Sequence, residues 1–183
     1  MGRFGFAVGF FVLLASVALP APASFAAAVV AQPGAIPVPD VVGGLQGCWH
    51  APGQVRGKDA SSIARGDWHI GHLYFMLQLR GLAAEKPYVA AIIYGGGPKV
   101  GTFGSYWLDV YGGTAPTQVT GAPTKDGFTV AYDYGDSVYT NLFTKKGNGW
   151  RWTIMERFKG KPEKLFAQYE LTPARCEGMA FDF

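Results

Sequence analysis

Charged side chains are sparse in this chain, and they are nearly balanced. The 183 residues carry 16 Lys and Arg against 13 Asp and Glu, which gives a formal net charge of +3. This excess is too small and too scattered to indicate binding to nucleic acid. We therefore expect a small molecule or an uncharged partner.

Catalytic signatures and metal ligands are also scarce. The sequence holds only three histidines and two cysteines. No Gly-x-Ser-x-Gly motif occurs, which leaves a hydrolase without support. The glycine-rich stretch 95–102 lacks the Gly-Lys-Ser/Thr ending of a phosphate-binding loop, so we expect a flexible hairpin loop there. No amphipathic pattern is long enough for a helix of three turns, which favours an all-β fold.

One long apolar run is present, at the N-terminus. A single positive charge precedes the uninterrupted small and apolar segment Phe4–Leu19. This pattern predicts a signal peptide over residues 1–26, with cleavage after Ala23, Ala26 or Ala28. A membrane anchor is the alternative, but it would need roughly 20 apolar residues. We expect a secreted or periplasmic protein without stable membrane insertion.

The rest of the chain divides into a leader, a folded domain and a tail. Residues 27–40 are rich in Ala, Pro and Val without a period, which is typical of a flexible leader. The folded domain is expected over residues 41–176, and residues 177–183 form a short tail. Cys48 and Cys176 stand near the two ends of this domain. A disulfide between them would tie these ends together in an oxidising compartment.

Alternation with a period of two predicts β-strands throughout the folded domain. Leu73, Phe75, Leu77 and Leu79, for example, alternate with more polar residues, and Gly135-Asp136 has the form of a two-residue hairpin turn. The predicted strands are 45–51, 60–65, 69–80, 88–94, 102–111, 117–120, 128–134, 137–145, 150–158 and 164–171.

Eight to ten short antiparallel strands must hide the edges of their sheet. Closure into a barrel removes these edges, whereas the alternative, a sandwich, usually needs long crossing connections. The connections here are mostly short and sequential. We therefore predict an all-β fold, a closed or nearly closed antiparallel barrel. A barrel of this size is either packed solid with side chains or holds one small ligand.

Two segments resemble a known family. Leu45-Gln46-Gly47-Cys48-Trp49 is similar to the Gly-x-Trp first strand of the lipocalins, in the calycin superfamily. The segments 149–154 and 165–172 look like the closing hairpin of secreted bacterial lipocalin-like domains of unknown function. The resemblance implies that Gly47 and Trp49 lie at the closed barrel end beside a basic side chain from a late strand. Arg157 is the first candidate for this side chain, and Arg151 is the second.

Several aromatic residues on the predicted strands could line one cavity. They are Trp107, Tyr132, Tyr134, Tyr139 and Phe166. A barrel packed solid with aromatics, serving as an interaction module, would show the same pattern.

Glu156 is unusual because it shares the parity of the apolar residues on its strand. A regular strand would direct it to the interior, where it could orient a ligand or act as an acid or base in an isomerase or cyclase. Alternatively, the strand twists outward, and Glu156 meets solvent near the rim beside Lys159 or Lys164.

His69 and His72 lie three residues apart. On a single strand over 69–80 they would point to opposite faces, so we predict no metal site there. His72 would share its face with Tyr74, and both are candidate ligand-binding residues. A haem held by His50, His72 or Tyr74 is a further hypothesis, and no other cofactor is expected.

Together these patterns predict a monomeric, secreted or periplasmic, lipocalin-like barrel that binds a small hydrophobic molecule. The alternatives are an isomerase or cyclase, a haem-binding protein, or a solid interaction module on the same barrel.

Overall fold

The computed structural model describes residues 34–83, 85–112 and 115–181. The predicted signal peptide and the first part of the predicted leader lie outside this range. The described residues form twelve β-strands and one short helix. The elements are α1 (Asp40–Gly43), β1 (Gly47–Ala51), β2 (Gly53–Val55), β3 (Lys58–Asp59), β4 (Ser62–His69), β5 (Tyr74–Gly81), β6 (Val89–Gly96), β7 (Phe103–Asp109), β8 (Gln118–Thr124), β9 (Gly127–Asp133), β10 (Ser137–Lys146), β11 (Gly149–Phe158) and β12 (Lys164–Ala174).

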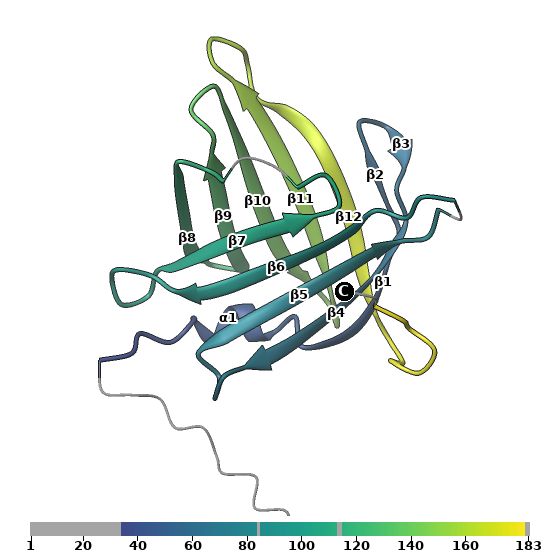
Figure 1. The fold of residues 1–183 in the computed structure, drawn as a ribbon, viewed down its shortest axis with the longest axis horizontal. Coiled ribbons are helices and arrows are strands. Elements are labelled where there is room, and N and C mark those ends of the chain that lie inside the picture. The colour runs from purple at the N-terminus through teal and green to yellow at the C-terminus, as the bar shows by residue number, and fades with distance from the viewer. Residues whose placement is uncertain (1–33, 84, 113–114, 182–183) are drawn as a thin grey trace, which may run out of the picture.

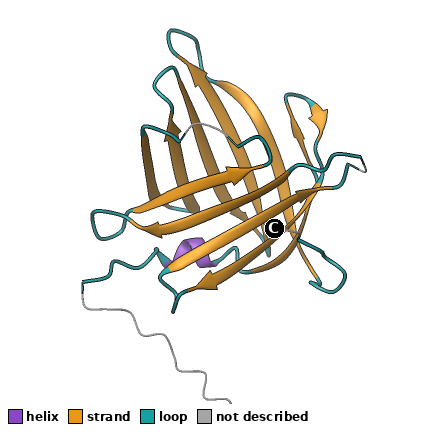
Figure 2. Cartoon of the chain, viewed as in Figure 1, coloured by secondary structure: helices purple, strands orange, loops and turns teal. Residues whose placement is uncertain are grey.

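The strands form one antiparallel sheet that closes on itself. From β4 to β12 each strand pairs with the next one in sequence, and β1 pairs with both β4 and β12. The described residues therefore build a closed barrel of ten strands, β1 and β4–β12 (Figure 1). Figure 2 shows how little of this fold is helical. The predicted all-β barrel is confirmed.

The β2–β3 hairpin is an addition to the ring. β2 continues from β1 and pairs with β12 farther along its length, where Ala167 lies opposite Val55. β3 pairs with β2. In Figure 1 this hairpin stands beside β12, high in the view, whereas α1 lies low. The two features therefore mark opposite ends of the barrel.

Side-chain alternation places the core as the sequence predicts. Phe75, Leu77 and Leu79 on β5 are buried, and the residues between them are more exposed. The hairpin between β9 and β10 is also confirmed. Its turn residue Gly135 has a φ of +84°, which glycine adopts without steric cost, and Tyr134 N donates to Ser137 O.

The helix α1 closes one end of the barrel. Val42 and the following Leu45 are fully buried. Two tryptophans anchor this segment, because Trp49 Nε1 donates to Leu45 O at 2.8 Å and Trp150 Nε1 donates to Gly44 O at 3.0 Å. Val38, within the predicted leader, is also buried. Packing against the core thus begins before residue 41.

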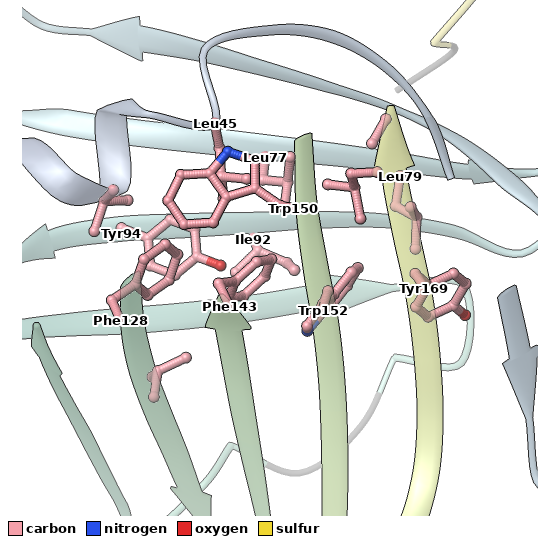
Figure 3. Packing of buried hydrophobic residues seen from close by; sticks show 14 of the residues in the cluster. Leu45, Leu77, Leu79, Ile92, Tyr94, Phe128, Phe143, Trp150, Trp152 and Tyr169 are labelled. Carbon is pink, nitrogen blue, oxygen red and sulfur yellow. The ribbon is translucent and has the colours of Figure 1, made fainter. Parts of the chain in front are cut away.

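Above this end, aromatic rings fill the barrel. Phe128 stacks on Phe143, Phe143 stacks on Trp152, and Trp152 contacts Tyr169, with centroid separations of 4.6, 4.9 and 5.1 Å. Figure 3 shows these side chains in a row across β9–β12. Ring contacts of this kind add to the stabilisation from burial. One half of the barrel is therefore solid.

The barrel is weakest between β7 and β8. These two strands share a single paired position, Phe103 opposite Gly121, whereas β10 and β11 share ten. Gly121 lets the ring of Phe103 lie against the backbone of β8, where a Cβ atom would be only 2.3 Å from the ring. Closure at this seam depends on packing more than on hydrogen bonds.

One expectation about local structure was wrong. Residues 69–80 are not one strand, because β4 ends at His69 and a turn over 70–73 leads into β5. Ile70, Gly71 and His72 in this turn have positive φ, which a strand does not permit. The sequence pattern also missed the short hairpin β2–β3 and the single-turn helix α1.

The disulfide is formed as predicted. Cys48 on β1 bonds to Cys176, which follows β12, and their Cα atoms are 5.3 Å apart. The bond lies beside the β1–β12 pairing, where Cys48 is in register with Ala174. It therefore reinforces the contact that closes the barrel.

Replacement of both cysteines by alanine should lower the free energy of unfolding by up to about 5 kcal/mol, because the bond closes a loop of 128 positions. Urea denaturation of the oxidised protein and the double variant measures the difference. Reduction of the native protein should produce the same loss. Equal midpoints for all three samples would contradict the role of the bond in closing the barrel.

Candidate functional site

The half of the barrel opposite α1 is hollow. It contains a cavity of about 600 Å³, a size typical of sites for small molecules. Residues of β4, β5, β7 and β9–β12, together with loop residues between them, form its wall, and β2 and β3 cover one side. Exposed Leu82 and Tyr111 mark its mouth. The barrel is thus not packed solid along its whole length.

The wall of the cavity is rich in aromatic residues. It includes Tyr88, Trp107, Tyr111, Tyr132, Tyr134, Tyr139, Phe166 and Tyr169. Five of these, Trp107, Tyr132, Tyr134, Tyr139 and Phe166, are the aromatics that the sequence suggested as cavity residues. The structure brings these five together around one space, and their role in binding stays a prediction.

Hydrogen bonds hold the aromatic groups at the mouth in place. Trp107 Nε1 donates to Tyr88 Oη at 3.0 Å, and Tyr88 Oη donates to Asp109 Oδ2 at 3.0 Å. Burial and the Asp109 carboxylate both raise the pKa of Tyr88 far above its ordinary value. Tyr88 therefore stays protonated, and the Trp107 ring has a fixed orientation over the cavity.

Deeper in the cavity, two more polar pairs occur. The hydroxyls of Tyr132 and Ser105 lie 2.7 Å apart, and burial raises the pKa of Tyr132. Asn141, only 2% exposed, accepts a hydrogen bond from Trp152 Nε1 at 2.8 Å. Trp152 belongs to the aromatic row of the solid half. Asn141 therefore lies at the floor of the cavity, where the hollow half meets the solid half.

Glu156 is buried, as one of the two sequence hypotheses stated, and the solvent-facing alternative was wrong. Its side chain is 1% exposed, with Oε2 at 2.7 Å from Arg56 Nη2 and Oε1 at 3.1 Å from Lys164 Nζ. The contact with Lys164, one of the lysines expected near it, is an ion pair without the angular geometry of a hydrogen bond. Glu156 is not part of the cavity wall.

This ion-pair cluster fixes the β2–β3 hairpin against the barrel. Arg56 occupies the hairpin turn with a φ of +50°, a strained value for a residue other than glycine. Its guanidinium lies over the ring of Phe166 at 5.1 Å, and its backbone N donates to Phe166 O. The contacts of Arg56 with Glu156 and Phe166 offset the strain. The cluster thus holds one side of the cavity wall in position.

The histidine candidates lie elsewhere. His72 stacks on Trp68 at 5.1 Å in the β4–β5 turn, and Trp68 packs against Gly43 of α1. Tyr74, 41% exposed, is also at this end, and His50 on β1 is exposed. None of these three side chains is part of the cavity wall. A haem held by them would lie outside the cavity.

The barrel-end candidates are only partly brought together. Gly47 begins β1 with a φ of +105°, and Trp49 is buried at the α1 end. Arg157, however, is exposed and in register with Val138, near the end of β11 that is far from Trp150. Trp49 has the backbone oxygen of Leu45 as its partner instead. The expected pairing of Trp49 with Arg157 is therefore not seen.

Sequence reasoning missed several residues of the cavity wall. Asn141 is the most informative, because it stands at the inward-facing position between Tyr139 and Phe143 on β10. A polar residue within an inward-facing series is the same signal that singled out Glu156. Tyr88, Asp109 and Tyr169 gave no comparable signal.

The described residues were also compared with the requirements for a metal site and for a membrane-spanning helix. Within the described residues, His, Cys, Asp and Glu form no group of three or more that could hold a metal ion. No helix in the described part of the chain is long and apolar enough to cross a membrane. A comparison with models of known protein families and with curated protein sequences finds no match to this chain.

Substitution of Glu156 by Gln should lower the free energy of unfolding by about 1–3 kcal/mol, because Arg56 and Lys164 lose their buried counter-charge. The matched control is Glu170→Gln, which removes the exposed pair with Arg151 and should change stability by less than about 1 kcal/mol. Urea denaturation measures both. Equal losses of stability in the two variants would show that the buried ion pairs of Glu156 stabilise the protein no more than the exposed pair of Glu170 does.

Stability should fall as the pH rises from 10 to 12. Burial raises the pKa of Tyr169 to about 12, whereas the unfolded chain ionises near 10. Between these values the unfolded state loses the proton first, so the stabilisation present below pH 10 is lost by pH 12. Tyr169→Phe should show a shallower decline, by up to about 1 kcal/mol per pH unit. Identical slopes in urea denaturation would contradict this assignment.

Proposed function

We propose that this chain is an exported, lipocalin-like binding protein that holds one small hydrophobic molecule in the barrel cavity. The single observation that supports this function is a cavity of about 600 Å³, with eight aromatic residues in its wall, inside a closed barrel. Burial of apolar surface against such walls supplies the free energy of binding, and a few polar groups orient the ligand.

The architecture is compatible with the lipocalin resemblance. Its ten-stranded antiparallel barrel closes through β1, the strand that carries Gly47 and Trp49. The Cys48–Cys176 disulfide suits the oxidising environment outside the cytoplasm, as the predicted signal peptide does. We infer a secreted or periplasmic monomer.

Binding is favoured over catalysis by the position of the one candidate acid or base. The isomerase or cyclase hypothesis depended on Glu156 reaching the ligand. This carboxylate is instead engaged by Arg56 and Lys164 and is absent from the cavity wall. The acidic groups that do border the cavity are Asp59 and Asp109, and both accept hydrogen bonds from the protein.

Filling the cavity should abolish binding. Ala60 is part of the cavity wall, so Ala60→Phe places a ring in the ligand space. The matched control is Ala131→Phe on β9, at a position outside the cavity wall that alternates with buried Val130 and Tyr132. The uncharged dye Nile red should bind one per chain, at least tenfold more weakly to Ala60→Phe and equally well to Ala131→Phe.

Fluorescence titration of the dye measures all three proteins, and far-ultraviolet circular dichroism checks that each one is folded. Equal binding to the native protein and Ala60→Phe, or no binding to either, would contradict the proposal. Native mass spectrometry of the protein purified from its own host should show a second mass, that of the natural ligand.

A further inference from the structure

Asn141 is a buried polar residue at the floor of the cavity. It lies on β10 in register with Val130 of β9 and Ile154 of β11, two buried apolar residues. Its side chain is part of the cavity wall and is 2% exposed. A buried amide in such surroundings is costly unless its hydrogen-bonding groups have partners.

The contact with Trp152 fixes which way the Asn141 amide points. An indole N–H can only donate, so the atom it contacts at 2.8 Å must be the carbonyl oxygen Oδ1. The Nδ2 group therefore points away from Trp152. It is a hydrogen-bond donor in a defined direction.

This donor has no hydrogen-bond partner among the described residues. Two fully enclosed side-chain atoms of the described residues also lack one, Tyr94 Oη and Glu156 Oε1. Asn141 Nδ2 is not itself fully enclosed, although the residue is almost completely buried. Its remaining accessible surface therefore faces the cavity, and a ligand acceptor can reach it there.

The other polar groups of the inner cavity do not require a hydrogen-bond acceptor on the ligand. Tyr132 is paired with Ser105, and the Tyr88 hydroxyl both accepts and donates within its own hydrogen-bond chain. The Tyr139 and Tyr169 hydroxyls can either donate or accept. Only the Asn141 amide nitrogen, which cannot accept, requires an acceptor on the ligand.

The charge and shape of the cavity wall further restrict which ligands can bind. The one basic side chain of the cavity wall is Lys86, which is exposed, whereas two carboxylates, Asp59 and Asp109, also border the space. An anionic ligand would therefore lie at the floor without a cation beside it, which is unfavourable in a buried site. The rings of Trp107, Tyr132 and Tyr169 instead offer flat apolar surfaces.

We propose that Asn141 sets the specificity of the cavity for an uncharged, flat molecule with a carbonyl oxygen, which accepts a hydrogen bond from Asn141 Nδ2. This inference rests on the proposed binding function. The carbonyl end of the ligand points to the floor, and its apolar remainder lies between the aromatic walls.

The test compares two probes with the same tricyclic skeleton, 9-fluorenone and fluorene, which differ by one carbonyl oxygen. Titration of the intact oxidised protein, followed by tryptophan fluorescence, gives both affinities. Fluorenone should bind on the order of tenfold more tightly than fluorene, because it satisfies a buried donor that fluorene leaves unpaired. The carbonyl stretching frequency of bound fluorenone should be lower than in hexane, since the hydrogen bond weakens that bond.

Asn141→Asp retains an oxygen for Trp152 and, when its carboxyl group is ionised, replaces the donor with a second acceptor oxygen. Asn141→Leu removes both polar atoms at nearly constant volume, so it also tests the proposal if the Asp variant does not fold. Both variants should lose the preference for fluorenone and the shift in carbonyl frequency. Fluorene should bind Asn141→Leu at least as tightly as it binds the native protein, because the unpaired donor is gone. Asn148→Asp, in the exposed β10–β11 turn, makes the same charge change and should behave as the native protein does.

The outcomes separate the two proposals. If fluorene and fluorenone bind equally, or if the preference and the frequency shift persist in both Asn141 variants, the role of Asn141 is overturned and the binding function stands. If neither probe binds and Nile red does not bind either, the binding function is overturned, and the inference about Asn141 is overturned with it.

Discussion

The pairing of β1 with β12 is the contact on which the rest of this structure depends. An open sheet of ten strands would expose two unpaired edges, and here the two potential edge strands satisfy each other. The Cys48–Cys176 bond lies beside this pairing and the Trp49 indole fixes the adjoining segment. Only a closed ring directs the alternate side chains of every strand to one interior, so both the core and the cavity follow from this closure.

The interior is divided along its length by side-chain size. Near α1, phenylalanine and tryptophan rings stack on one another and leave no space, whereas toward the β2–β3 hairpin the inward positions include smaller residues such as Ser62 and Gly81. The boundary is the hydrogen bond between Trp152 and Asn141. The solid half gives the barrel its stability, and this rigid base holds the polar floor of the hollow half in a fixed orientation.

Polar groups in the hollow half serve two different purposes. The Glu156 cluster holds the hairpin that covers the cavity, and the Trp107–Tyr88–Asp109 chain orients an aromatic wall. The charged and polar atoms of both groups have ion-pair or hydrogen-bond contacts within the protein. The amide nitrogen of Asn141 is satisfied by nothing in the described chain, and this difference separates a structural polar group from one available to a ligand.

The sequence by itself determined most of the barrel strands, the turn at Gly135 and the pairing of the only two cysteines, because alternation, turn chemistry and cysteine number are local or countable properties. It also suggested five aromatic residues that meet around the cavity. It could not locate the β4–β5 turn at His72, because consecutive positive φ values leave no apolar period. It suggested Lys164 but not Arg56 as a partner of Glu156, since Arg56 is 100 positions away. Tertiary structure alone decided that one end is filled, that the other is hollow and which way the Asn141 amide points, because these depend on packing between strands distant in sequence.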